Sequence, residues 1–486
     1  MFIGREIELN NLNELFYQKR FHLFILYGRR RVGKTTLLKE FCKDKDAIFF
    51  SAEQSNEKMN LEKFSGEIFA HYGQTNIEPF SGFENALRYI SERQGKKPLV
   101  LVLDEFPYLA HANKALISQL QHLIDHHLKE SNLFIVLCGS YMGFMEKQVL
   151  GSKSPLFGRR TAQLQLKPFT YLTSLNFLEG FSNEDKLILY GAVGGTALYL
   201  EQIRQNLSVE DNIKSLFLKQ IGYLYEEPML LLRQEVQEPG VYFAIIEAIA
   251  GGAGTSGEIS QKTGEDAAKC LKYIKVLIQL GIIHKENPLG EKQGGRKARY
   301  RVADLMFRFW FRYVAANKSL LETGAADIVW KRRIEPNLPD YMGHVFEIIC
   351  KEYIIRLNNQ GKLPILATKI GRWWGNDPER KREAEIDLVA MDGDSIIFCE
   401  CKWKNEVMKP KVINQLEEMA DVFRKKRVST WFYLFSKSGF SPELIQMASR
   451  RDDIVLVSLD DIADSYAAPM KPQLSPAKKP QCDILC

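Results

Sequence analysis

Residues 23–35 read LFILYGRRRVGKT, and this stretch decides the fold of the first part of the chain. Its first five residues form an apolar run that is typical of a buried strand. The next eight, residues 28–35, match the pattern G-x-x-x-x-G-K-T, and residues 36–42 favour a helix. A buried strand, a glycine-rich loop and a helix in this order predict a loop that binds a phosphate group.

Each fixed position of this loop has a chemical reason. Gly28 and Gly33 let the backbone wrap around a phosphate, so that amide N–H groups point at it. Lys34 neutralises the β and γ oxygens, Thr35 supplies a ligand to Mg²⁺, and the amino end of the following helix adds a favourable dipole. We therefore predict ATP and Mg²⁺ as cofactors. The residues expected to bind the nucleotide are Gly28, Arg29, Arg30, Arg31, Val32, Gly33, Lys34, Thr35 and Thr36.

Two further apolar runs end in polar residues that suit the same chemistry. Residues 99–103 lead directly into Asp104 and Glu105, and residues 133–138 lead towards Ser140. We expect Asp104 to hold the magnesium ion and Glu105 to polarise the attacking water. Ser140 is expected to contact the γ-phosphate. The alternative for the first run is a strand that ends in two solvated acids.

The composition is that of a globular chain. Of 486 residues, 45 % are hydrophobic and 26 % are charged, and a length of roughly 150 residues per domain suggests about three domains. No apolar run approaches the ~18 residues that span a bilayer, and the first residues do not resemble a secretory signal. Eight scattered cysteines suit a reducing compartment. We therefore expect a cytoplasmic protein without membrane association.

Positive charge is concentrated in one part of the chain. The net charge is +6, but residues 291–333 alone hold eleven Lys or Arg against four acids. Such a local basic field is the usual footprint of a nucleic-acid partner, and we predict DNA. The alternative is a solvated face whose arginines pair with another domain. Arg159 and Arg160 are candidates for an arginine finger, with a surface salt bridge as the alternative for either.

The pattern changes along the chain and predicts three domains and a tail. Residues 1–204 alternate short apolar runs with helical stretches, as in an α/β domain with a mainly parallel sheet. Residues 205–335 are mostly helical in period, and residues 336–466 combine strands with helices. The proline- and lysine-rich residues 467–486 predict a disordered tail.

The middle segment predicts a winged helix-turn-helix. Helices are expected over residues 243–249, 256–263 and 267–280, followed by a β-hairpin. The third helix is the candidate recognition helix, with Lys269, Lys272 and Lys275 at helical spacing, and residues 291–299 form the candidate wing. Such a module contacts DNA phosphates, but winged helices also serve as protein contacts that pack on an ATPase domain.

Three segments of the N-terminal part resemble the archaeal-type ATPases, which are AAA+-related NTPases of the STAND-like group. They are residues 2–9 (FIGREIEL), 103–106 (LDEF) and 194–200 (GGTALYL). The resemblance implies an AAA+-like parallel sheet domain with a lid, and it implies that residues 2–5 lie near the adenine. The chain departs from the family at Ala197, where a proline is usual, and this departure concerns the lid.

A second cluster lies in residues 385–402, which read EIDLVAMDGDSIIFCECK. The Asp-Gly pair at 392–393 predicts a hairpin in which Leu388 faces Cys399, so that Asp387 sits opposite Glu400. Because side chains alternate along a strand, Glu385, Asp387, Glu400 and Lys402 are expected on one face. The other face is expected to hold Ile386, Leu388, Ala390, Ile397, Cys399 and Cys401.

The D…E-x-K pattern on adjacent strands resembles the active site of PD-(D/E)XK nucleases. Residues 341–457 are similar to the nuclease-like domain, of DUF234 type, that ends this ATPase family. The resemblance implies a restriction-endonuclease-like α/β fold, and it implies that Glu347 joins the metal site. Asp387 and Glu400 would hold Mg²⁺, and Lys402 would act on a water and on developing charge. The alternatives are a salt-bridged cluster and a retained fold without cleavage activity.

These inferences predict an ATP-hydrolysing protein that acts on DNA through a winged helix and a C-terminal nuclease domain, with catalytic residues Glu105, Asp387, Glu400 and Lys402. One alternative is a nucleotide-dependent switch whose C-terminal domain only binds DNA or protein. Another is a motor, which needs an oligomeric ring and a working arginine finger. A homo-oligomer or a partner protein therefore stays open.

Overall fold

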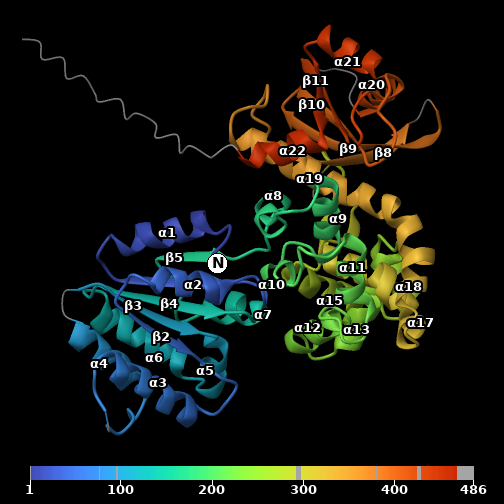
Figure 1. Ribbon diagram of the computed structural model, residues 1–486. Coiled ribbons are helices and arrows are strands. Elements are labelled where there is room, and N and C mark those ends of the chain that lie inside the picture. Colours follow the sequence, from blue (N-terminus) through green and yellow to red (C-terminus); the bar gives the residue numbers. More distant parts are fainter. Residues whose placement is uncertain are drawn as a thin grey trace, which may run out of the picture.

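A parallel sheet organises the N-terminal part of the molecule (Figure 1). The computed structural model describes residues 2–75, 77–94, 97–291, 297–377, 380–423 and 428–467. The strands of the first sheet are β1 (His22–Tyr27), β2 (Ala47–Ser51), β3 (Leu99–Asp104), β4 (Leu133–Gly139) and β5 (Ala162–Gln165), in the order β2-β3-β4-β1-β5. All pairings are parallel. Strands β1, β3 and β4 are buried along their whole length, and this is why their sequences read as continuous apolar runs.

Helices cover both faces of this sheet. On one face, Leu12, Leu37 and Phe41 pack against Phe24 and Phe134 of the strands. The helices of this part are α1 (Glu6–Phe16), α2 (Lys34–Cys42), α3 (Glu57–His71), α4 (Phe83–Gln94), α5 (Phe106–Ala112), α6 (Leu116–Leu123) and α7 (Met142–Phe144). The apolar-run pattern did not predict β5, because its sequence AQLQ is half polar and it lies at the edge of the sheet.

The middle of the chain is helical, with one small hairpin. Its helices are α8 (Tyr171–Ser174), α9 (Asn183–Val193), α10 (Ala197–Leu200), α11 (Val209–Ile213), α12 (Glu227–Glu235), α13 (Pro239–Ala250), α14 (Ser256–Thr263) and α15 (Ala267–Gln279). The antiparallel strands β6 (Ile283–Glu286) and β7 (Arg299–Val302) follow. The predicted order of three helices and a hairpin is therefore confirmed. Most of the predicted wing, residues 292–296, lies outside the described residues.

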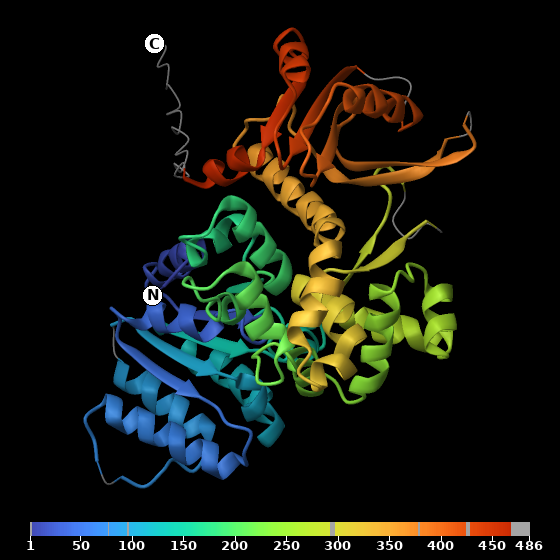
Figure 2. The same ribbon diagram turned by 45° about the vertical axis from the view of Figure 1, so that its right-hand side comes forward.

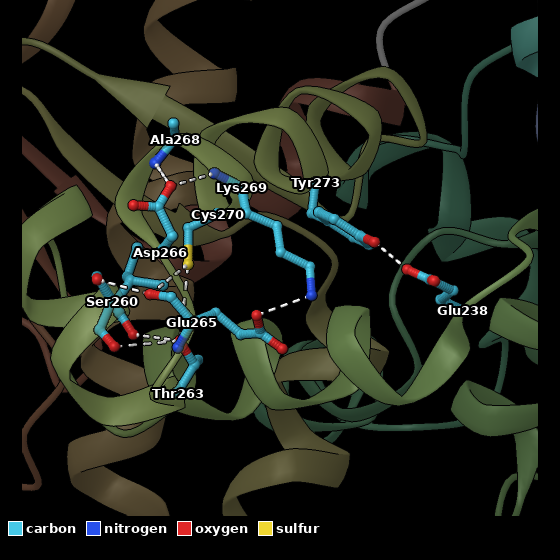
Figure 3. A network of polar contacts seen from close by, with 10 residues as sticks. Glu238, Ser260, Thr263, Glu265, Asp266, Ala268, Lys269, Cys270 and Tyr273 are labelled. Carbon is cyan, nitrogen blue, oxygen red and sulfur yellow. Dashed lines mark hydrogen bonds and ion pairs between the residues drawn. The ribbon is translucent and has the colours of Figure 1, made fainter.

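Local capping explains where α14 and α15 begin. Thr255 and Glu258 form a capping box at the start of α14, and Gly264 ends that helix with a positive φ of 71°. Asp266 then accepts hydrogen bonds from the backbone N–H groups of Ala268 and Lys269 and starts α15 (Figure 3).

A long helix joins the helical region to the C-terminal part (Figure 2). After α16 (Leu305–Phe309), α17 (Lys318–Glu322) and α18 (Ala326–Val329), helix α19 (Leu338–Asn359) runs up to the second sheet. Tyr341 on α19 is fully buried, and its hydroxyl donates to the carbonyl of Gly191 at 2.7 Å. The aromatic residues of 307–313 are buried, as expected for core positions.

The C-terminal sheet is mixed. Its strands are β8 (Lys369–Asp377), β9 (Arg382–Asp392), β10 (Ser395–Lys402), β11 (Ser429–Ser436) and β12 (Ile454–Ser458), in the order β12-β11-β10-β9-β8. Helices α19 and α20 (Lys411–Phe423) pack on opposite faces, and α21 (Pro442–Ser449) and α22 (Leu459–Ala467) complete the fold. Residue 467 of the predicted tail ends α22, and residues 468–486 lie outside the described residues. The fold is thus α/β, with a parallel sheet, a helical region and a C-terminal α/β sheet.

The predicted hairpin register is confirmed, with one correction. Cys399 pairs with Leu388, and Leu388 lies in the cluster that faces α19. Ile386 instead packs in the cluster that faces α20. The reason is a register shift, because β8 advances two residues between Gly371 and Trp373 while β9 advances three, from Val389 to Ile386. The resulting irregularity in β9 lies between Val389 and Ile386, a stretch that includes Asp387, and such bulges re-aim side chains.

Candidate functional site

The glycine-rich loop joins β1 to α2 as predicted. Gly33 has a φ of 95°, in the left-handed region that favours glycine, and a Cβ on Gly28 would lie 2.4 Å from the carbonyl oxygen of Leu166. Lys34 is buried, and its Nζ donates to the carbonyls of Gly28 at 2.8 Å and Arg29 at 3.1 Å. Burial lowers the pKa of Lys34. The left-handed φ of Gly33 and the close approach of Leu166 to Gly28 therefore require glycine at both positions.

The polar residues at the ends of β3 and β4 meet this loop. The Thr35 hydroxyl donates to Asp104 at 2.8 Å. Glu105 follows with a φ of 51°, and the Ser140 hydroxyl donates to its carboxylate at 2.6 Å. The structure thus brings Lys34, Thr35, Asp104, Glu105 and Ser140 together.

A cavity of about 410 Å³ opens over the loop. Lys34, Thr35 and Glu105 line it together with Ala197 of α10 and Gln234 of α12. Converging backbone amides and a lysine suit phosphate groups, and hydroxyl and carboxylate oxygens are the ligands that Mg²⁺ prefers. The residues present therefore fit a magnesium nucleotide.

Arg5 lies against the same loop. Its guanidinium donates to the carbonyls of Val32 at 3.1 Å and Lys167 at 2.6 Å, and it lies 3.9 Å from the ring centroid of Phe169. The segment expected near the adenine is thus anchored beside the glycine-rich loop.

The three arginines of the loop pair with acids of the helical region, which the sequence analysis did not foresee. Arg29 pairs with Asp304 at the start of α16. Arg30 Nε lies 3.5 Å from Glu235 Oε1, and Arg31 pairs with Glu227; both acids belong to α12. These acids are far from the loop in sequence and follow no motif, so no sequence signal marks them.

One arginine-finger candidate is already engaged. Arg159 contacts Asp125 with Nε at 3.0 Å and Nη2 at 2.7 Å. This pairing lowers the pKa of Asp125 to about 2. Arg160 lies with its guanidinium 5.7 Å from the ring centroid of Phe157. For Arg159, the salt-bridge alternative describes this structure.

The second candidate cluster forms on β9 and β10. The backbone N–H of Cys401 donates to Asp387 Oδ2 at 2.9 Å, and Lys402 hydrogen-bonds to Glu400. Burial raises the pKa of Asp387, and burial together with the Asp387 charge raises the pKa of Glu400 to about 7. The Glu400 carboxylate raises the pKa of Lys402 against the effect of burial. Asp387, Glu400 and Lys402 therefore form one coupled group.

Glu347 on α19 lies near this group but is held by an arginine. Its Oε2 is 3.0 Å from Nη1 of Arg372 on β8, and Arg372 also pairs with Glu385 on β9. Within the ranges that the structure describes, no group of three or more His, Cys, Asp or Glu side chains is arranged to hold a metal ion. Mg²⁺ needs only one or two carboxylates beside waters and substrate phosphates, so Asp387 and Glu400 fit it as a pair.

The basic residues predicted to contact DNA differ in exposure and in whether they form ion pairs. Lys269, Lys272 and Lys275 are exposed on α15, and Lys269 pairs with Glu265 at 2.8 Å (Figure 3). Several basic residues of the 291–333 stretch instead form ion pairs, and of these only Arg312 pairs with an acid outside residues 205–335. These pairs are Lys297 with Glu291, Arg301 with Glu286, Arg312 with Asp340 and Lys318 with Glu226. In the part of the chain described here, no helix is long and apolar enough to cross a membrane.

Comparisons with known proteins agree with the first site. A family described as an ATPase domain predominantly from Archaea matches residues 2–203, and a family described as archaeal and bacterial proteins of unknown function (DUF234) matches residues 310–418. An uncharacterized protein of Methanocaldococcus jannaschii is 32 % identical over 432 residues, which are 88 % of this chain and 92 % of that protein. An uncharacterized ATP-binding protein of Pyrococcus abyssi is 29 % identical over 261 residues, covering 44 % of this chain and 76 % of its own length.

Among solved structures, a Walker-type ATPase of Pyrococcus abyssi aligns with a TM-score of 0.48 and 20 % identity, over 64 % of this chain and 96 % of its own. The match to the Methanocaldococcus protein covers most of the chain, and the two family matches lie in its N-terminal and C-terminal parts. The chain therefore belongs to the family of archaeal-type P-loop ATPases that carry a C-terminal DUF234 domain.

Proposed function

We propose that this ATPase acts on DNA and that its C-terminal sheet carries a Mg²⁺-dependent nuclease site. The observation that supports this most directly is the half-buried group on β9 and β10, in which Asp387 accepts a hydrogen bond from the backbone N–H of Cys401 and Lys402 hydrogen-bonds to Glu400. Withdrawing two carboxylates and a lysine partly from water costs free energy, so a structural role alone accounts for them poorly. We divide the chain into an ATPase unit (1–204), a helical unit (205–335) and a nuclease-like unit (336–466).

In the ATPase unit, each residue takes a role from its position. Lys34 would leave the carbonyls that it now contacts and bind the β and γ oxygens of ATP. Thr35 and Asp104, already bonded to each other, would hold the magnesium ion that neutralises phosphate charge. Glu105 would orient the attacking water, and Ser140 fixes the position of its carboxylate.

In the nuclease-like unit, Asp387 and Glu400 would hold a magnesium ion, which supplies a Lewis acid next to the scissile phosphate. The Lys402 ammonium lies beside Glu400 and would stabilise the negative charge that develops on the phosphate as water attacks. The exposed lysines of α15 would hold the DNA backbone without reading its sequence.

A second function is supported by a specific contact. Arg372 pairs with both Glu347 and Glu385, so a guanidinium already neutralises the carboxylate expected to complete the metal site. In this alternative the protein is a nucleotide-dependent switch, and its C-terminal unit binds DNA or a protein without cutting.

The two functions separate in one experiment. Cleavage and binding of DNA are measured for the wild type, for Asp387→Asn and for the control Glu383→Gln, which changes an exposed carboxylate on the same strand. The nuclease proposal expects Mg²⁺-dependent cleavage that only Asp387→Asn abolishes. Binding without cleavage in all three proteins supports the switch. If the wild type neither binds nor cuts DNA, the assignment to DNA is overturned.

A further inference from the structure

Helix α12 ends in a carboxylate that lies beside the nucleotide cavity and that the ATPase chemistry does not use. Glu235 is the last residue of α12, and its neighbour Gln234 lines the cavity over Lys34 and Thr35. The Glu235 side chain is 1 % exposed, and neither of its oxygens has a hydrogen-bond partner. Its nearest ion-pair partner is Arg30 of the glycine-rich loop, at 3.5 Å. A buried carboxylate without hydrogen bonds is costly and calls for an explanation.

The charges around Glu235 are those that a bound triphosphate would use. The positive charges of Arg30, Lys34 and Arg29, in decreasing order, lower the pKa of Glu235. All three residues belong to the glycine-rich loop. The negative charge of Glu105 raises the pKa of Glu235. Despite the three cations, burial raises the pKa of Glu235 to about 7. A γ-phosphate placed at Lys34 would therefore meet a like charge that competes for the same cations.

The segment after Glu235 contacts α15, the candidate recognition helix. Glu238, three residues on, accepts a hydrogen bond from the hydroxyl of Tyr273 on α15 (Figure 3). One short segment thus contacts the nucleotide loop at one end and α15 at the other. A cavity of about 450 Å³, lined by residues 235–238, Lys272 and Tyr273, leaves this segment room to move.

We propose that Glu235 is the residue with which this protein distinguishes ATP from ADP. Its carboxylate and the γ-phosphate compete for Arg30 and Lys34, so ATP displaces it and ADP does not. The displacement passes through residues 236–238 to Tyr273 and changes how α15 is held. The inference rests on the proposed nucleotide site and adds to it a residue from α12.

The first test compares the affinities of the full-length chain for ADP and for adenylyl imidodiphosphate, a non-hydrolysable ATP analogue, in Mg²⁺. Glu235→Gln keeps the size of the side chain and removes the charge. We expect it to raise the affinity for the ATP analogue by about tenfold relative to ADP. The matched control is Glu247→Gln, an exposed carboxylate on α13 outside the nucleotide cavity, and its ratio should stay within about twofold of wild type.

Equal shifts for both nucleotides, or no shift, would overturn the role of Glu235 while leaving the nucleotide site in place. Failure of the wild type to bind either nucleotide would overturn the proposed site itself.

The second test needs no substitution at Glu235. Amide hydrogen exchange in α15 of the wild type should be faster with the ATP analogue than with ADP. Tyr273→Phe removes the bond to Glu238, so it should abolish this difference and preserve the affinity ratio. Identical exchange with the two nucleotides in the wild type would contradict the transmission to α15.

Discussion

Nη1 of Arg372 on β8 lies 3.0 Å from Oε2 of Glu347 on α19, and another nitrogen of the same guanidinium pairs with Glu385 on β9. The arginine therefore ties the long helix to the edge of the C-terminal sheet, beside Asp387 and Glu400. A divalent cation at this place would compete with Arg372 for Glu347. Glu347 can therefore bind either Arg372 or a metal ion, and the contact with Arg372 marks the site without metal.

Replacing Arg372 should expose this competition. In Arg372→Gln the Glu347 carboxylate loses its cation, so we expect Mg²⁺ to stabilise the variant more than the wild type. A tenfold excess of Mg²⁺ over its Kd adds about 1.4 kcal/mol to the free energy of unfolding. Thermal melting with and without Mg²⁺ measures the effect. Lys369→Gln, which changes an exposed lysine at the start of β8, is the control, and equal Mg²⁺ responses in both variants would contradict a metal role for Glu347.

Lys34→Ala should remove ATP hydrolysis. The Nζ of Lys34 is held over the glycine-rich loop at the start of α2, and losing a group that stabilises transition-state charge costs about 100-fold in rate. Phosphate release measures the change. Lys39→Ala, on the exposed side of the same helix, should hydrolyse ATP at the wild-type rate. Normal hydrolysis by Lys34→Ala would place the ATPase site elsewhere.

Glu352 should make stability depend on pH. Its carboxylate accepts from the backbone N–H of Tyr171 at 2.9 Å, and burial raises its pKa from 4.5 to about 7. The folded state then holds a proton that the unfolded chain releases, so stability falls as pH rises from about 4.5 through 7. Glu352→Gln should remove this loss, which is on the order of 3 kcal/mol above pH 8.

Melting temperatures at pH 5 and pH 8 check this expectation. The gain from Glu352→Gln should appear at pH 8 and be small at pH 5. The exposed Glu335→Gln should show no such gain. An equal gain at both pH values would mean that titration of Glu352 is not the cause.

Gly195→Ala should destabilise the contact between the turn that follows α9 and the chain after β5. A Cβ on Gly195 would lie 1.8 Å from the carbonyl oxygen of Phe169, whose N–H donates to the Gly195 carbonyl at 2.7 Å. We expect a loss of about 2 kcal/mol or more, measured by denaturant unfolding. Gly240→Ala in α13 meets no heavy atom within 4 Å and should be neutral or slightly stabilising. An unchanged free energy of unfolding in Gly195→Ala would show that the chain at Phe169 moves to make room for the Cβ.

Much of the architecture follows from local sequence. The apolar runs before Gly28 and Asp104 predict β1 and β3 because strands of a parallel sheet are buried on both faces. The Asp-Gly turn at 392–393 predicts the pairing of β9 with β10 because a short loop fixes the register. Each of these signals spans no more than about twenty consecutive residues.

What local sequence does not predict depends on contacts between distant segments. The polar edge strand β5 is defined by its pairing with β1, and the irregularity at Asp387 by the pairing of β8 with β9. The acids that pair with Arg30 and Arg31 come from α12, about 200 residues away, where no spacing rule applies. The site residues were predicted as motifs, but their electrostatic partners were not.

Cleavage of DNA is the activity that the proposed nuclease site on β9 and β10 must have. Single- and double-stranded DNA are incubated with Mg²⁺ or Mn²⁺, with and without ATP, using the wild type and the Glu400→Ala, Lys402→Ala double variant. We predict metal-dependent cleavage by the wild type and none by the double variant, with ATP hydrolysis intact in both. If the wild type hydrolyses ATP but cuts no DNA under any of these conditions, the nuclease proposal is contradicted and the protein is a nucleotide-dependent switch.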